Sequence, residues 1–135
     1  MITMTTKKSI LESLVLTETK NTPSVHFNAK SGLLEITGRS IPEHPSEFYE
    51  KLITWLDIYV NEPHKHTLVR MRFDYFNTSS SKCILDMLKK VSKINQAEHT
   101  ALVEWICEQQ DEEMKEAGVD FMELIKIPFS IIVTG

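Results

Sequence analysis

Glycine is scarce in this chain, and the loops with which many enzymes hold phosphate are missing. Its 135 residues include four glycines, and the patterns GxGxxG, GxxxxGKS/T and GxSxG do not occur. Dinucleotide-binding folds, P-loop enzymes and α/β-hydrolases use such glycines in turns that cradle phosphate or expose a nucleophile. The absence of all three motifs argues against these enzyme classes and predicts a non-enzymatic protein without a cofactor.

Cysteine is scarce as well, which bears on metal sites and disulfides. Cys83 and Cys107 have no CxxC spacing and lie in a predicted helix and a predicted strand, so we interpret both as reduced core residues. His64 and His66 form an HxH pair in a polar turn, without a matching cysteine, histidine or aspartate at ligand spacing. The acidic run 111–113 is typical of a helix start, where carboxylates stabilise the helix dipole. The sequence therefore predicts no metal site.

The chain has neither a long apolar run nor a basic stripe. Its N-terminal MITMTTKKSI is too polar for a secretory signal, and nothing approaches the roughly 20 apolar residues of a membrane span. We therefore expect a cytoplasmic protein without a membrane partner. The net charge is −4 and the lysines are scattered, which argues against nucleic-acid binding. One local group, which we interpret as the solvated side of a helix, consists of Lys82, Lys89, Lys90 and Lys93.

The overall composition is that of one globular α/β domain. Apolar residues make up 41% of the chain and charged residues 25%, which suits a single domain with a sizeable core. We assign residues 1–20 to a poorly defined N-terminal extension and residues 21–135 to the domain. Within the extension, the apolar patch Leu11 to Leu16 fits either a short helix or an edge strand.

Hydrophobic periodicity predicts about five strands, the first two in a hairpin, and three main helices. The strands are expected at 25–27, 33–36, 68–76, 99–107 and 129–133, and the helices at 46–61, 78–94 and 114–125. Gly38 should close the second strand. Gly118 interrupts the apolar face of the last helix, so it indicates either close packing or a break there. The buried face of the first helix is expected to carry Phe48, Leu52, Trp55, Leu56 and Tyr59.

The strand at 68–76 runs directly into the candidate site, a junction that ends in four consecutive hydroxyl residues, Thr78 to Ser81. Asn77 is a favoured helix N-cap, and the apolar residues downstream recur at helical spacing, so we predict that a helix begins at Thr78 or Ser79. A strand, helix, strand unit crosses over right-handedly, which places Thr78 at the carboxyl edge of the sheet. Free amides and the helix dipole favour an anion there.

Spacing alone leaves several interpretations of this junction open. Serine and threonine are expected at helix caps whatever the function, so an ordinary serine-rich cap is the favoured interpretation. One hydroxyl could instead carry a phosphoryl group, which a helix start tolerates, or the helix start could hold an anionic ligand without covalent modification. An enzyme that used Thr78 or Ser79 as a nucleophile would need a base, and the sequence places no histidine beside them.

Several separated motifs together resemble the SiaC family of bacterial regulatory phosphoproteins over about residues 21–133. They include GLLEITG at 32–38, SIPE at 40–43 with EFY at 47–49, and the closing Pro128-Phe129. The most specific motif consists of Tyr75, Phe76, Asn77, Thr78, Ser79, Ser80, Ser81 and Lys82.

This resemblance implies a STAS-like fold with a mixed sheet, similar to anti-sigma factor antagonists, and a partner-switching cycle. It implies that a protein kinase phosphorylates Thr78 and that a PP2C-type phosphatase removes the phosphate. The unmodified form would bind and activate a diguanylate cyclase in cyclic di-GMP signalling and biofilm formation. The other motif residues would then form the partner-binding context of Thr78. The alternative is a STAS-like small-ligand or anion sensor that is not phosphorylated.

Overall fold

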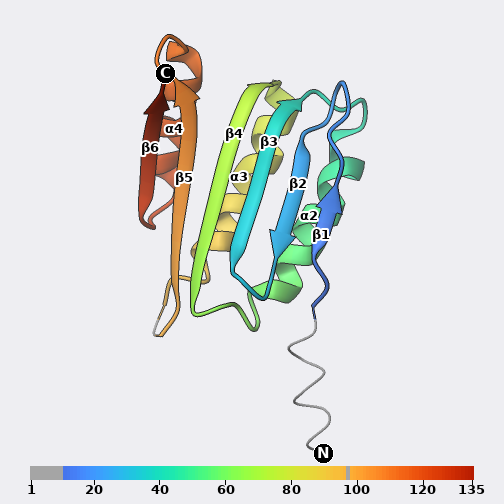
Figure 1. Cartoon of the computed structure of the whole chain (residues 1–135), viewed down its shortest axis with the longest axis vertical. Helices are drawn as coiled ribbons and strands as arrows, with labels where there is room; N and C mark the ends of the chain where they lie inside the picture. Colours follow the sequence, from blue (N-terminus) through green and yellow to red (C-terminus); the bar gives the residue numbers. More distant parts are fainter. Residues whose placement is uncertain (1–10, 97) are drawn as a thin grey trace, which may run out of the picture.

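The computed structural model describes residues 11–96 and 98–135, which form one mixed sheet with three helices (Figure 1). The elements are β1 (Leu14–Leu16), β2 (Ser24–Asn28), β3 (Leu33–Ser40), α2 (Pro45–Tyr59), β4 (His66–Phe76), α3 (Thr78–Ser92), β5 (Thr100–Glu108), α4 (Glu112–Leu124) and β6 (Phe129–Thr134). Over the described ranges, no helix has both the length and the apolar character that crossing a membrane requires.

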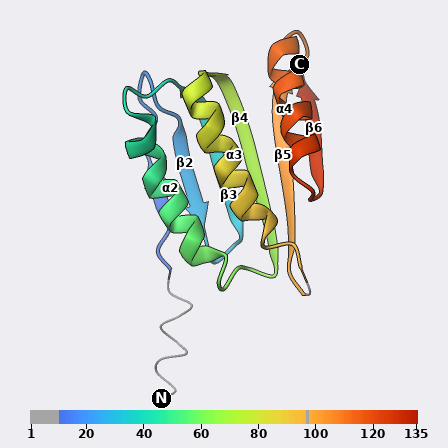
Figure 2. The same cartoon turned by 180° about the vertical axis from the view of Figure 1, so that it is seen from behind.

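The six strands lie in the order in which they follow one another along the chain. Strands β1, β2 and β3 pair antiparallel, whereas β3, β4, β5 and β6 are all parallel. The mixed α/β sheet and the N-terminal hairpin are therefore confirmed. The strand count was one too low, because Leu14–Leu16, within the patch that fitted a helix or an edge strand, forms the edge strand β1. All three helices lie on one face of the sheet (Figure 2).

The core lies between the sheet and these helices. Helix α3 buries Ile84, Met87, Leu88 and Val91 as its spacing predicts. In α2 the prediction was wrong at one position, since Phe48 is half-buried and its neighbour Tyr49 is fully buried. Gly118 marks close packing rather than a break in α4, because a Cβ atom there would lie 2.7 Å from Trp105 Nε1.

A β-bulge in β4 decides which aromatic side chains at its carboxyl end enter the core. Gly38 pairs with Phe73, but the next residue of β3 pairs with Tyr75, so Asp74 is an extra residue on β4. Without the bulge, Tyr75 would follow Phe73 into the core. With it, Tyr75 is 52% exposed, and Phe76 packs 6.1 Å from Trp105 between ring centroids.

Strand β3 continues beyond Gly38, contrary to the expectation that this glycine closes it, and ends at Ser40. Gly38 has a φ of 128°, and a Cβ atom there would lie 2.7 Å from a carboxylate oxygen of Glu18. This region of φ and this close approach both favour glycine. The two residues added to the strand carry Ser40 inward, where it is completely buried.

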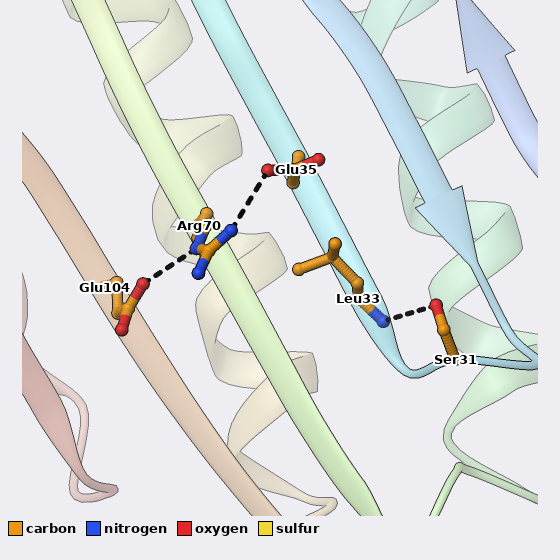
Figure 3. A network of polar contacts seen from close by, with 5 residues as sticks. All are labelled: Ser31, Leu33, Glu35, Arg70 and Glu104. Carbon is orange, nitrogen blue, oxygen red and sulfur yellow. Dashed lines mark hydrogen bonds and ion pairs between the residues drawn. The ribbon is translucent and has the colours of Figure 1, made fainter.

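On the other face of the sheet the described residues form no helix, and a row of charged side chains crosses three strands (Figure 3). The Arg70 guanidinium lies 2.9 Å from a carboxylate oxygen of Glu104 and 3.6 Å from one of Glu35. The hydrogen bond to Glu104 raises the pKa of Arg70. Because the Arg70 side chain is 43% exposed, solvent screens this row, which contributes little stability.

Candidate functional site

Helix α3 begins at Thr78, immediately after β4, as predicted. Asn77 has extended dihedrals, and its side-chain oxygen accepts a hydrogen bond of 2.9 Å from the backbone amide of Ser80. Its backbone carbonyl accepts another, of 3.0 Å, from the amide of Ser81. Because β4 lies between two parallel neighbours, this cap places the first turn of α3 at the carboxyl edge of the sheet.

The four consecutive hydroxyls at this junction are in different environments. Thr78 and Ser79 are exposed, Ser80 is completely buried, and Ser81 is half-buried. Ser80 precedes Ile84 by four residues, so helical geometry turns it toward the core together with the apolar face. Helical spacing in the sequence could therefore have identified Ser80 as an internal residue. Of the four hydroxyls, only those of Thr78 and Ser79 are freely accessible.

A buried hydrogen-bond network, formed by Ser40, Tyr49 and Ser80, holds the start of α3 in place. The Ser40 hydroxyl donates to the Ser80 hydroxyl at 2.9 Å, and the Ser80 hydroxyl donates to the Ser40 carbonyl at 3.0 Å. The Tyr49 hydroxyl lies 2.5 Å from the Ser40 hydroxyl. Since the Ser40 proton is already used toward Ser80, Tyr49 is the donor in this contact. The network connects the ends of β3, α2 and α3.

No role at the site was predicted for Ser40 or for Tyr49, the residue of α2 in this network. Burial raises the pKa of Tyr49 to about 12. The phenol therefore stays protonated and continues to donate at physiological pH. Tyr49 also lies at helical spacing from Leu52, Leu56 and Tyr59, a signal that could have placed it in the core.

The remaining motif residues divide between the surface and the interior. Phe76 is half-buried and packs against both Trp105 and Phe121, and Asn77 is the cap. The exposed members, which we call the Thr78 rim, are Tyr75, Thr78, Ser79 and Lys82. The motif thus consists of a surface part and a supporting part.

Among the hydrogen bonds of the described residues, none joins the side chain of Thr78 or Ser79 to a histidine or a carboxylate. A hydroxyl without such a partner is a poor nucleophile. The site therefore gives no support to the enzyme alternative.

The candidate metal ligands have structural contacts. His66 Nδ1 lies 2.8 Å from the Thr100 hydroxyl, and His64 Nδ1 lies 3.0 Å from the backbone carbonyl of His66. Asp111 caps α4 by accepting a hydrogen bond of 3.1 Å from the backbone amide of Met114. Within the described ranges, no group of three or more histidine, cysteine, aspartate or glutamate side chains could hold a metal ion.

Both cysteines are free thiols in different positions. Cys107 is buried in the core as predicted, whereas Cys83 is only half-buried, on the surface of α3. Burial raises the pKa of both thiols, with further contributions from Asp86 at Cys83 and from Asp111 at Cys107. Neither thiol is therefore activated as a nucleophile.

Comparisons with known proteins agree on one group. The family model described as SiaC family regulatory phosphoprotein matches residues 16–134. An uncharacterized protein of Pseudomonas aeruginosa (strain UCBPP-PA14) is 26% identical over 121 residues, which cover 90% of this chain and 96% of that protein.

Solved structures from Pseudomonas aeruginosa are similar over the same span. Apo-SiaC is 25% identical, with a TM-score of 0.81 over 90% of this chain and 98% of that one. The structure of diguanylate cyclase SiaD in complex with its activator SiaC contains a chain that is 26% identical, with a TM-score of 0.83 over 90% of this chain and 99% of that one.

Proposed function

Because this chain belongs to the SiaC family of regulatory phosphoproteins, we propose that it is a non-enzymatic switch controlled by phosphorylation of Thr78. In this proposal a protein kinase adds the phosphate, a PP2C-type phosphatase removes it, and the unmodified chain binds and activates a diguanylate cyclase. The observation that carries the proposal is the similarity to the SiaC structures, one of which is of SiaC as the activator of a cyclase.

The choice of Thr78 rests on access and on its place in the helix. It is the first residue of α3 and is exposed, whereas Ser80 is completely buried and both donates and accepts hydrogen bonds. An anion near a helix N-terminus contributes about 0.3 to 1 kcal/mol of stability. Phosphorylation of Thr78 should therefore leave the fold intact. Ser79 is also exposed, so the resemblance of the motif decides between the two.

The phosphate would act on binding rather than on folding. Enclosing a dianion in an interface without a cationic partner costs several kcal/mol. A differential of about 5.5 kcal/mol moves a complex from almost fully bound to almost fully free. Lys82, one turn further along α3, is the single cation of the Thr78 rim, and we propose that it contacts either the phosphate or the partner.

Mass spectrometry of the protein purified from its native host tests the modification. We expect a mass increase of one phosphate, located on Thr78 by peptide mapping and absent from the Thr78→Ala variant. Ser79→Ala is the matched control and should keep the phosphate. Undiminished phosphate on Thr78→Ala would exclude this assignment. A co-purifying metabolite without any phosphate would favour the alternative of an anion sensor.

A further inference from the structure

The two edges of the sheet differ in length and charge (Figure 1). At one edge, β1 has only three residues and is flanked in the sequence by the acidic residues Glu12 and Glu18. At the other edge, β6 has six residues, Phe129–Thr134, none of which is charged. Natural sheets protect their edges from pairing with other chains by shortening the edge strand or by placing charged side chains there. Strand β1 shows both forms of protection, whereas β6 shows neither.

The outer edge of β6 carries backbone groups that its pairing with β5 does not use. At the start of this pairing, the Val103 amide donates a hydrogen bond of 3.0 Å to the Pro128 carbonyl. At its end, the Gln109 amide donates one of 2.9 Å to the Thr134 carbonyl. The even-numbered residues of β6 therefore face β5, since backbone groups alternate in direction along a strand. The amides and carbonyls that point away from β5 are those of Phe129, Ile131 and Val133.

The side chains of the same three residues form an apolar row. They lie on the face of the sheet that α4 covers, because a Cβ atom at Gly118 of α4 would come within 2.8 Å of Ile131 Cδ1. Phe129 and Ile131 are half-buried and pack against the core, whereas Val133 is 43% exposed. Strand β6 thus has outward hydrogen-bonding groups and an exposed apolar side chain along the same edge.

A second β6 strand, antiparallel to the first, fits this edge. In an antiparallel sheet, two residues that exchange both of their backbone hydrogen bonds lie directly opposite each other. A two-fold axis at Ile131 places this residue opposite its own copy and Phe129 opposite Val133, so every outward amide and carbonyl gains a partner. Opposed aromatic and β-branched side chains stabilise a sheet, and Phe129 of each copy would cover the exposed Val133 of the other. The paired strands bring no like charges together, because neither contains a charged residue.

We propose that two copies of this chain pair through β6, antiparallel and about a two-fold axis at Ile131, to form one continuous sheet. A two-fold contact is closed, so the assembly stops at two copies. The outer edge of β6 lies beyond β5, whereas the Thr78 rim lies at the end of β4, so the pairing uses a surface separate from the rim. The dimer therefore depends neither on phosphorylation nor on the cyclase.

Sedimentation velocity tests the pairing, with the same substitution placed at either edge of the sheet. Because strand pairing buries little surface, we expect a dimer of twice 15.6 kDa, formed with a micromolar Kd and populated at about 100 μM. Val133→Lys places a charge opposite Phe129 and should raise the dimer Kd by roughly tenfold or more. Val15→Lys, at a 62% exposed valine of β1, is the matched control and should leave the Kd within about twofold.

Amide hydrogen exchange followed by NMR tests the register. The amides of Phe129 and Ile131 should exchange more slowly in the wild-type chain than in Val133→Lys at the same concentration. Those of Ser130 and Ile132 should be equally slow in both proteins, because β5 already pairs them. Val133→Pro removes one outward donor without removing a bond to β5, so it should weaken the dimer as Val133→Lys does. Thermal melting of each variant separates loss of pairing from loss of the fold.

Three results would contradict the proposal. They are a wild-type chain that stays monomeric at about 100 μM, a dimer that Val133→Lys weakens no more than Val15→Lys does, and a mass that grows beyond two copies. If the wild-type chain is monomeric and Val133→Lys instead weakens binding of the cyclase or the kinase, β6 pairs with a strand of another protein and the assignment to a second copy is wrong. A dimer that binds no cyclase would contradict the proposed function and leave the pairing through β6 intact.

Discussion

Thr78 and Ser80 are two residues apart, carry similar hydroxyls and lie in opposite environments in this structure. Ser80 is completely buried and hydrogen-bonded to Ser40, whereas Thr78 is exposed. The difference arises because consecutive helical residues point about 100° apart, so a run of hydroxyls must divide between core and solvent. The buried hydroxyl holds the helix start in position, and the exposed one is available for modification.

The largest expected effect concerns Thr78, the exposed residue of the two. Phosphorylation of Thr78 should weaken binding to the target cyclase by as much as about 5.5 kcal/mol, because the interface would have to enclose a dianion. Thr78→Asp should weaken it less, since it carries a single charge, and Thr78→Ala should bind like wild type. Isothermal titration calorimetry measures these affinities. Equal affinity of the phosphorylated and unmodified forms would contradict a role for the rim in binding.

The next largest effect concerns Tyr49, in the buried network around Ser80, and depends on pH. Burial raises the pKa of Tyr49 from 10.0 to about 12. Between these values the unfolded chain has released the phenol proton and the native chain has kept it, so stability falls as pH rises from about 10 to 12. The expected loss is on the order of 2 to 3 kcal/mol.

Urea unfolding of wild type and Tyr49→Phe across this pH range measures that loss. The free energy of unfolding of wild type should fall relative to that of Tyr49→Phe as pH rises from about 10 to 12, because the variant lacks the titrating group. Tyr75→Phe, at an exposed tyrosine, is the control for general alkaline destabilisation. A constant difference between wild type and Tyr49→Phe from pH 9 to pH 12 would argue against a raised pKa.

The smallest effect compares the two hydroxyls directly. Ser80→Ala should lower the free energy of unfolding by about 1 to 3 kcal/mol, because Ser40 loses a buried hydrogen-bond donor and a buried acceptor. Ser79→Ala, its exposed neighbour, should change it by no more than about 0.5 kcal/mol. Chemical denaturation at neutral pH measures both variants. Similar values for the two would show that the buried network does not stabilise the start of α3.

Much of the fold could be predicted because its signals are local. Within the described ranges, the periodicity of apolar residues located all three helices and five of the six strands, and Asn77 marked the start of α3 within one residue. Strand β1 was ambiguous because three residues are too few to show a period. The last two residues of β3, Arg39 and Ser40, are polar and carry no strand signal in the sequence. They belong to the strand because they pair with β4.

The part of the candidate site that could be predicted also depends on local signals. A cap forms between residues three positions apart, so the sequence by itself determined where α3 begins and that a hydroxyl stands there. The contact between Ser40 and Ser80 spans 40 positions and depends on how β3 and α3 meet. The bulge at Asp74 depends on the register of two strands, and that register exposes Tyr75 and turns the half-buried Phe76 toward the core. Only the tertiary structure decided these features, because their partners are brought together by packing and are distant in the chain.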